Sequence, residues 1–301
     1  MAAVAAGGVK PAYPEHLRAQ VERYLQSLRF TEEPVCRGLE EAMTYSLLAG
    51  GKRIRPVLAL ASAEAVGRPA ASVLPLAAAL ELIHTYSLIH DDLPAMDDDD
   101  FRRGAPTCHR AFGEAVAILA GDGLYAEAFS LLLSEQQAEP ADLLAAAREL
   151  AAATGVQGMV GGQYMDVAAA AAPDLAGLRH LHELKTGRLI AASIECALLV
   201  AGLREHDKIR SFRAFAAELG VLFQIVDDIL DVTGSVQTLG KRQGSDERLG
   251  KRTYVSEFTL DGARELAGES HRRACAALAE AAPGGAAELE QITDFIATRS
   301  Y

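Results

Sequence analysis

The sequence contains no tryptophan, and only 6% of its 301 residues are aromatic. Runs of β-branched residues are few, and no stretch alternates between apolar and polar residues for long enough to predict a half-buried strand. Alanine and leucine dominate instead, and these residues rank at the top of the helix-propensity scale. The composition therefore predicts an all-α protein.

Cysteine is also scarce, since the four cysteines are widely spaced and form no CxxC pair. This spacing argues against a disulfide framework and against a zinc site, and it fits a reducing cytoplasm. Residues 1–10 lack the basic start and apolar run of a signal peptide. The longest apolar stretch, residues 189–203, contains Glu195 and is short for a bilayer span. We therefore expect a soluble protein in which residues 1–12 are disordered.

Basic residues are outnumbered, and the formal net charge is −12. A nucleic-acid-binding face requires a basic stripe to meet the phosphates, so this charge balance argues against nucleic acid as a partner. An acidic surface of this kind favours solubility.

What the sequence does contain is helical periodicity. Apolar residues recur at spacings of three and four in residues 17–28, 76–90 and 215–229, which is typical of helices. We find no linker or internal repeat, so we expect a single domain over residues 1–301. Residues 113–133 and 188–203 are apolar on most of their circumference, which predicts central helices. A ring of long helices around a deep central cavity would suit an apolar ligand with a polar head.

The most distinctive segment is residues 90–100, HDDLPAMDDDD, in which six of the last ten residues are aspartates. The preceding apolar pattern predicts a helix that runs into Asp91 and Asp92, and Pro94 prevents its normal continuation. Carboxylates at a helix C-terminus are destabilised by the negative end of the helix dipole and by their mutual repulsion. A bound cation would offset both effects, whereas the alternative is a solvated acidic loop.

A second acidic cluster, in residues 223–231 (FQIVDDILD), makes the cation more plausible. On a helix, Gln224, Asp227, Asp228 and Asp231 share one face, and the segment around them is too apolar for an ordinary exposed helix. Magnesium combines few carboxylates with waters and substrate phosphates. Two such clusters that face each other across a cavity would hold a metal-bound diphosphate.

Basic residues adjoin both clusters and several glycines. They lie in the segments GGKRIRP (residues 50–56), FRRG (101–104), KTG (185–187) and the polar stretch 240–250 with Lys241 and Lys251. Each of them taken alone is an ordinary solvated charge. The GGKR segment is not a Walker loop, because the required glycine–lysine spacing and the final Ser or Thr are missing.

Together these segments resemble the trans-isoprenyl diphosphate synthases. The markers, in order over residues 45–254, are GGKRIRP, DDLPAMD followed by RRG, GGQYMD, KTG, FQIVDDILD and LGKRQGSD. The likeness is greatest to the bacterial farnesyl diphosphate synthases of that family. The resemblance implies an isoprenoid-synthase-type fold, a homodimer and three magnesium ions per active site.

The resemblance also implies roles for individual residues. Asp91, Asp97 and Asp227 would be direct magnesium ligands, with Asp92, Asp228 and Asp231 in support. The allylic diphosphate would be held by Arg102, Lys185, Thr186, Gln224, Lys241 and Lys251. The diphosphate of isopentenyl diphosphate would be held by Lys52, Arg55, His84 and Arg103. Of these, Asp91, Asp97, Asp227, Lys185 and Arg102 are the expected catalytic residues.

The implied reaction is the head-to-tail condensation of isopentenyl diphosphate with dimethylallyl or geranyl diphosphate, which releases pyrophosphate. Tyr86 lies five residues before Asp91, about 7.5 Å deeper along the helix, where a bulky ring beside the small Ser87 would close the pocket floor. This arrangement and the longer DDLPAMD spacing favour farnesyl diphosphate as the product. If Tyr86 is an ordinary core residue, geranylgeranyl diphosphate is the leading alternative.

Other classes of protein remain to be weighed. A terpene cyclase would lack a second diphosphate pocket, and a head-to-head condensing enzyme would need a reductase or rearrangement site that we do not find. A non-catalytic regulatory subunit of a prenyl synthase heteromer would be expected to have lost one aspartate motif, and a calcium-buffering protein would release no pyrophosphate. Both motifs are intact here.

Overall fold

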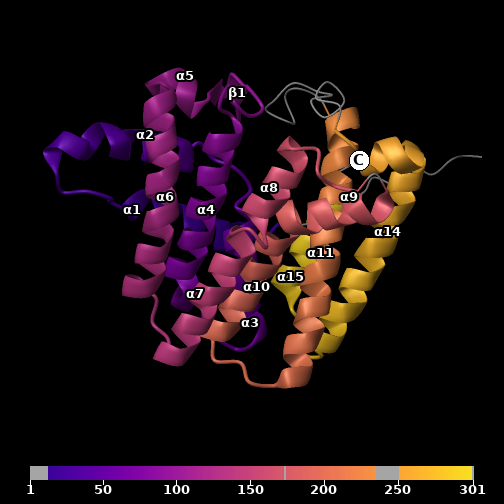
Figure 1. Ribbon diagram of the computed structural model, residues 1–301. Coiled ribbons are helices and arrows are strands. Elements are labelled where there is room, and N and C mark those ends of the chain that lie inside the picture. Colours follow the sequence, from indigo (N-terminus) through magenta and orange to yellow (C-terminus); the bar gives the residue numbers. More distant parts are fainter. Residues whose placement is uncertain (1–12, 173, 235–250, 300–301) are drawn as a thin grey trace, which may run out of the picture.

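The computed structural model describes residues 13–172, 174–234 and 251–299. These residues are almost entirely helical, which confirms the all-α prediction (Figure 1). The helical elements are α1 (Glu15–Ser27), η1 (Pro34–Cys36), α2 (Arg37–Leu47), α3 (Ile54–Ala65), η2 (Ala70–Val73), α4 (Leu74–Asp91), α5 (Cys108–Phe112), α6 (Glu114–Glu135), α7 (Pro140–Thr154), α8 (Met159–Val167), α9 (Leu175–His182), η3 (Glu183–Gly187), α10 (Arg188–Val200), α11 (His206–Thr233), α14 (Tyr254–Ala281) and α15 (Ala287–Thr298).

The helix boundaries follow the expected local signals. Pro140 begins α7, where its missing N–H costs no intrahelical hydrogen bond, and α4 ends at Asp91 three residues before Pro94. Between Asp91 and α5 the chain forms a short antiparallel hairpin of β1 (Phe101–Arg102) and β2 (Ala105–Pro106). The sequence did not predict this hairpin, because a two-residue strand has no periodicity to detect.

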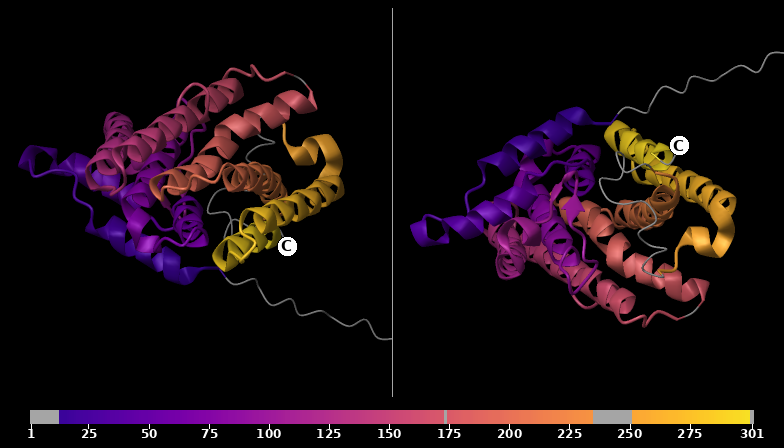
Figure 2. Two further views of the ribbon diagram at one scale, coloured as in Figure 1. Left: turned by 90° about the horizontal axis from the view of Figure 1, so that it is seen from below. Right: turned by 90° about the horizontal axis from the view of Figure 1, so that it is seen from above.

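The core lies where α4, α10 and α11 are surrounded by the other helices. Seen along the helix axes, α11 lies inside the bundle and packs against α14 and α10 (Figure 2). Most residues of α10 are buried, which confirms the central position predicted from its sequence. This arrangement brings the C-terminal half of α11 and the C-terminal end of α4 to the same end of the bundle.

The predicted central position is wrong for α6. This helix packs against α4 (Figure 1), but Leu119 and Leu133 on it are 55% and 53% exposed. By length and composition alone, Ala70–Asp91 and Glu114–Glu135 would qualify as membrane spans, and 61% and 33% of their apolar windows are buried in the molecule. The core therefore accounts for the apolar character of α4, whereas much of the apolar surface of α6 is exposed.

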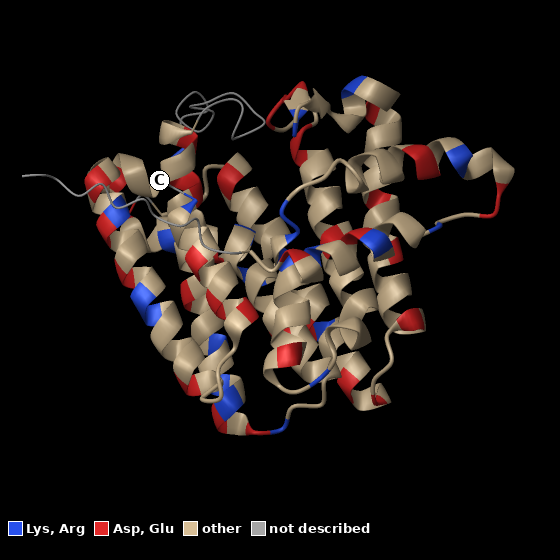
Figure 3. Ribbon diagram, turned by 180° about the vertical axis from the view of Figure 1, so that it is seen from behind, with Lys and Arg blue, Asp and Glu red and all other residues tan. Residues whose placement is uncertain are grey.

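Along the ribbon in Figure 3, Lys and Arg positions are scattered among Asp and Glu positions. Over the described part of the chain, this agrees with the net charge of −12.

Candidate active site

A cavity of about 660 Å³ lies between the C-terminal end of α4, helix α8, the segment η3 and helix α11. It brings together most of the residues that the sequence nominated. These are Arg55, His84, Tyr86, Ser87, Asp91, Arg102, Arg103, Lys185, Thr186, Gln224 and Asp227. The remaining lining is largely apolar and includes Leu93, Met96, Ile118, Met159, Val160 and Phe223.

The first acidic cluster lies where α4 ends. Asp91 lines the cavity, and its Oδ1 accepts a hydrogen bond of 2.8 Å from Gln163 Nε2. The loop then turns back, so that the Asp97 N–H donates to the Asp91 carbonyl at 2.9 Å. Burial raises the pKa of Asp91 to about 6; Lys185 opposes this shift and Asp97 adds to it. The charged form of Asp91 is therefore poorly stabilised by the protein alone.

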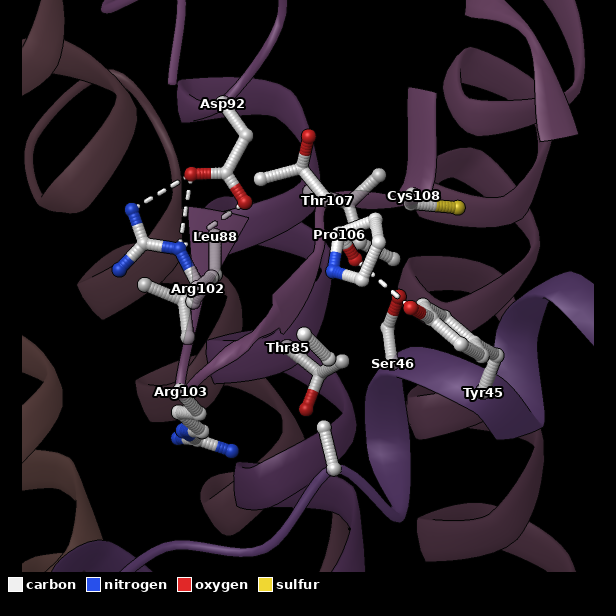
Figure 4. A pocket seen from close by; sticks show the side chains of 13 residues that line it. Tyr45, Ser46, Thr85, Leu88, Asp92, Arg102, Arg103, Pro106, Thr107 and Cys108 are labelled. Carbon is white, nitrogen blue, oxygen red and sulfur yellow. Dashed lines mark hydrogen bonds and ion pairs between the residues drawn. The ribbon is translucent and has the colours of Figure 1, made fainter. Parts of the chain in front are cut away.

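Unlike Asp91, Asp92 does not line this cavity, and it is only 3% exposed. Both of its oxygens accept from Arg102 Nε, at 2.7 and 2.9 Å, and Arg102 Nη2 approaches to 2.6 Å (Figure 4). Burial raises the pKa of Asp92, and the bond from Arg102 lowers it again. A second, much smaller cavity of about 30 Å³ borders this pair and is too small for a diphosphate. Asp92 therefore fixes the hairpin, which aims Arg102 at the main cavity.

The second acidic cluster lies within α11. Asp227 lines the cavity, whereas Asp228 is 2% exposed and accepts from Gln224 Nε2 and from the Tyr254 N–H, both at 2.7 Å. The Gln224 carbonyl oxygen in turn accepts from the Thr186 hydroxyl at 3.0 Å. Asp228 thus joins α11 to the start of α14 and orients Gln224 toward the cavity. Asp231, one turn further on, is also buried, at 4% exposed.

The KTG segment forms a π-helical turn, η3, between α9 and α10. π-Helical turns inside helices often occur at functional sites, because they redirect a side chain. A Cβ at Gly162 would lie 2.3 Å from the Lys185 backbone nitrogen, so this glycine lets α8 approach η3 closely. The Lys185 ammonium then reaches Asp166 at 2.6 Å, and this pairing lowers the pKa of Asp166 against the effect of burial.

Lys251, which lies just before α14, adds a second cation beside Asp166. Its ammonium lies 3.1 Å from Asp97 Oδ1 and 3.7 Å from Asp166 Oδ2. Lys185 and Lys251 thus both approach Asp166, and Lys251 also reaches Asp97 of the first acidic cluster. Lys241, the other lysine predicted for this role, lies outside the described residues.

The three basic residues of the GGKRIRP segment, Lys52, Arg53 and Arg55, lie in three different environments. Arg53 is 3% exposed and pairs with Glu22 and Glu81 in the core, whereas Arg55 lines the cavity. Lys52 does not reach the cavity lining; its ammonium lies 5.1 Å from the centre of the Phe295 ring. Burial lowers the pKa of Arg55 to about 10, and its buried Nε has no hydrogen-bond partner among the described residues.

The position of the Arg103 guanidinium explains why two glycines precede Lys52. Its guanidinium donates to the Gly50 carbonyl, and a Cβ on Gly51 would lie 2.9 Å from its central carbon. The φ angle of Gly51, +129°, is also one that other residues rarely adopt. Arg55, Arg103 and His84 therefore line one region of the cavity. Burial, followed by these arginines, lowers the pKa of His84 well below its usual value, so its ring is neutral at neutral pH.

Several residues in or beside the cavity were not predicted from the sequence. Gln163 and Asp166 belong to the noted GGQYMD motif, but neither had been given a role. Phe223 lines the cavity beneath two guanidinium groups, those of Arg55 at 5.8 Å and Arg299 at 4.1 Å from its ring centre. The GGQYMD motif could have pointed to Gln163 and Asp166, whereas no sequence pattern connects Arg299 with the distant Phe223.

Known proteins resemble the chain along most of its length. The family model described as polyprenyl synthetase matches residues 36–293. The chain belongs to this family. It is 44% identical to a farnesyl diphosphate synthase of Geobacillus stearothermophilus, over 93% of each chain, and 43% identical to one of Escherichia coli, over 96% of this chain and 99% of that one. It is also 45% identical to geranylgeranyl pyrophosphate synthase 9 of Arabidopsis thaliana, over 87% of this chain and 74% of that one.

Solved structures of polyprenyl synthetases agree with the fold. A geranyltransferase of Helicobacter pylori, crystallised with magnesium and isoprenyl diphosphate, superimposes with a TM-score of 0.82 at 31% identity, covering 96% of each chain. A geranyltransferase of Legionella pneumophila gives 0.81 at 34% identity, covering 96% of this chain and 94% of that one. The predicted isoprenoid-synthase-type bundle is thereby confirmed.

Proposed function

We propose that the chain condenses isopentenyl diphosphate head-to-tail with dimethylallyl or geranyl diphosphate, to give farnesyl diphosphate and pyrophosphate. The observation that carries this proposal is the distribution of charge around one cavity. Asp91 and Asp227 line it together with Lys185 and Arg102, while Arg55, Arg103 and His84 line a second polar region. Two polar regions on one largely apolar cavity suit two diphosphates whose hydrocarbon parts must meet.

The carboxylates fit magnesium. Their oxygens are hard donors, and the cost of keeping Asp91 charged, seen in its raised pKa, is the kind that a cation removes. From the family resemblance we propose three ions per site, which Asp91, Asp97 and Asp227 would hold together with the substrate phosphates. Bound magnesium would supply positive charge to the leaving diphosphate.

The protein's own groups account for the rest of the chemistry. Lys185, Thr186, Gln224, Arg102 and Lys251 hold the allylic diphosphate, and stabilise the charge that it gains as its C–O bond breaks. We assign Lys241 to the same group by motif only. The apolar walls exclude water from the allylic cation, which the double bond of isopentenyl diphosphate attacks. The departing diphosphate then accepts the proton, so no side-chain base is required.

Tyr86 is proposed to limit the product to fifteen carbons. It lines the cavity five residues before Asp91, and its ring meets the ring of Tyr125 edge-to-face at 5.0 Å, which holds it in place. Ser87 beside it leaves space, and its hydroxyl is turned back to the His84 carbonyl at 2.9 Å.

Product analysis tests the proposed reaction. The purified chain is incubated with magnesium, labelled isopentenyl diphosphate and either allylic starter, and the dephosphorylated products are separated by chromatography. We expect farnesol with both starters and no product when a chelator removes the metal. Geranylgeraniol would instead favour the alternative product, and complete inactivity of a folded protein would favour a regulatory subunit.

We further propose a homodimer in which the exposed apolar side of α6 is buried. Leu119 and Leu133 lie on this side, and large exposed apolar patches are typical of interfaces. Light scattering after size exclusion tests this with Leu119→Glu, which should yield monomers. The control is Leu144→Glu on α7, where Leu144 is 61% exposed, and this variant should remain dimeric. A monomeric unmodified protein would refute the proposal.

A further inference from the structure

A cluster of three different ligand types lies away from the cavity, where α14 meets α15. His271 and Cys275 are four residues apart on α14 and therefore lie on the same side of that helix. Asp294 approaches them from α15. The imidazole and the carboxylate are accessible, with side chains 28% and 52% exposed. The cysteine spacing in the sequence argues against a zinc site built from paired cysteines, but it does not bear on a site shared between two helices.

The three ligand atoms converge. His271 Nε2 lies 2.7 Å from Asp294 Oδ1 and 3.6 Å from Cys275 Sγ, and all three atoms lie within 4.8 Å of one another. Tetrahedral zinc, with bonds of about 2.0–2.1 Å to N and O and about 2.3 Å to S, separates nitrogen from oxygen by about 3.3 Å and nitrogen from sulfur by about 3.5 Å. The sulfur–nitrogen distance already fits, and the hydrogen-bonded pair must open by only about 0.6 Å.

A catalytic triad is the obvious alternative reading of Cys, His and Asp, but the geometry excludes it. In a triad the carboxylate binds one imidazole nitrogen, while the nucleophile uses the other. Here Asp294 and Cys275 both approach Nε2. Burial, with help from Asp294 and Glu290, also raises the pKa of the Cys275 thiol, which opposes a reactive thiolate in the metal-free protein.

We propose that His271, Cys275 and Asp294 bind a zinc-class transition-metal ion, with the fourth coordination position open to water. A thiolate and an imidazole select such an ion over magnesium, so this site is independent of the carboxylates of the cavity. The ion would fasten α15 to α14. Because Arg299 directly follows α15 and stacks on Phe223 in the cavity wall, the site anchors the helix that leads to that contact.

Another group in the described part of the chain provides a useful contrast. His16, Glu64 and Glu288 also bring three ligand atoms within 4.8 Å, but this group contains no sulfur. Any metal that binds there, or at the aspartates of the cavity, gives no thiolate signal. A readout specific for sulfur therefore isolates the proposed site.

Cobalt substitution provides that readout. The full chain, reduced and free of metal, is titrated with Co²⁺ and followed by absorption. We expect tetrahedral visible bands and a thiolate-to-cobalt charge-transfer band, both abolished by one equivalent of Zn²⁺. Cys275→Ser should lose the charge-transfer band, and His271→Ala and Asp294→Asn should each weaken Co²⁺ binding at least about tenfold. Cys36→Ser, which changes an exposed cysteine, is the matched control and should retain the band.

Thermal unfolding gives a second measurement that needs no chromophore. A ligand that binds only the folded state raises the melting temperature, so Zn²⁺ should raise that of the unmodified chain but not that of Cys275→Ser. Turnover with magnesium should be the same in both proteins, which separates this proposal from the proposed reaction. A cobalt band that survives in Cys275→Ser, a band lost in Cys36→Ser, or no band and no thermal shift in the unmodified chain would each overturn it.

Discussion

Asp91–Asp92 at the end of α4 and Asp227–Asp228 within α11 are two aspartate pairs that border the same cavity. In each pair the first residue lines the cavity and the second is buried, at 3% exposed for Asp92 and 2% for Asp228. The buried members have different partners. Among the described residues, Arg102 pairs with Asp92, whereas the Gln224 amide and the Tyr254 backbone N–H both donate to Asp228.

The positions of the two pairs explain this difference. Asp92 is the C-cap of α4, where the negative end of the helix dipole opposes a carboxylate, so a guanidinium is needed to hold it. Asp228 lies inside the 28-residue helix α11, one turn after Gln224, which donates to it. Asp92 thus ties the end of α4 to the hairpin, and Asp228 ties α11 to the start of α14. In each pair one residue lines the cavity and the other supports the surrounding fold.

The largest effect is expected from removing the two cavity-facing carboxylates. In Asp91→Asn and Asp227→Asn, kcat/KM should fall at least about 10³-fold, because losing about 4 kcal/mol of transition-state stabilisation has that effect. Steady-state kinetics with magnesium measures the loss, and circular dichroism should show an unchanged helical content.

Asp98→Asn is the matched control for the first cluster. Asp98 is exposed and has a φ of +52°, a conformation that asparagine adopts readily, so the fold should tolerate the change. Its kcat/KM should stay within about twofold of the unmodified value. Equal losses in Asp98→Asn and Asp91→Asn would mean that overall negative charge matters, not the direction of one carboxylate.

The sequence was enough to place Asp91 and Asp227, which line the cavity, but not to find the partners of the buried Asp92 and Asp228. Helical period and Pro94 placed Asp91 at a helix end, and the three-and-four spacing placed Asp227 on a shared face with Gln224. The pairing of Asp92 with Arg102 depends on a two-residue hairpin, and that of Asp228 with Tyr254 crosses 26 positions of chain. The position of Lys52 was likewise not predictable, because composition does not show which basic residue of GGKRIRP points to the cavity.

Substitution of the buried aspartates, Asp92 and Asp228, should lower the free energy of unfolding by different amounts. Asp92→Asn removes the partner of a charged hydrogen-bonded group and should lower the free energy of unfolding by about 2–3 kcal/mol. Asp228→Asn keeps one accepting oxygen but turns an amide N–H toward a donor, which should cost about 1 kcal/mol. Urea denaturation measures both values. A larger loss in Asp228→Asn than in Asp92→Asn would contradict this expected order.

Aromatic residues at similar depth below the two clusters extend the comparison. Tyr86 lies five residues before Asp91 on α4 and packs against Tyr125, whereas Phe223 lies four residues before Asp227 on α11 beneath two arginines. Tyr86→Ala should shift the product from fifteen carbons toward twenty, as measured by chromatography, because it removes the proposed floor of the cavity. Tyr86→Phe keeps the ring and should leave the chain length unchanged. If Tyr86→Ala gave a product of unaltered length, the Tyr86 ring would be an ordinary core group and not the cavity floor.

The smallest effect is expected at Phe223. Its ring lies beneath the guanidinium groups of Arg55 and Arg299, and each cation–π contact contributes about 0.5–2 kcal/mol. Phe223→Leu keeps an apolar side chain but removes the π face, so KM for isopentenyl diphosphate should rise roughly three- to tenfold with little change in kcat. Product length should stay the same, in contrast to Tyr86→Ala. A longer product from Phe223→Leu would mean that both aromatic residues limit the chain, and that the cavity floor is shared between α4 and α11.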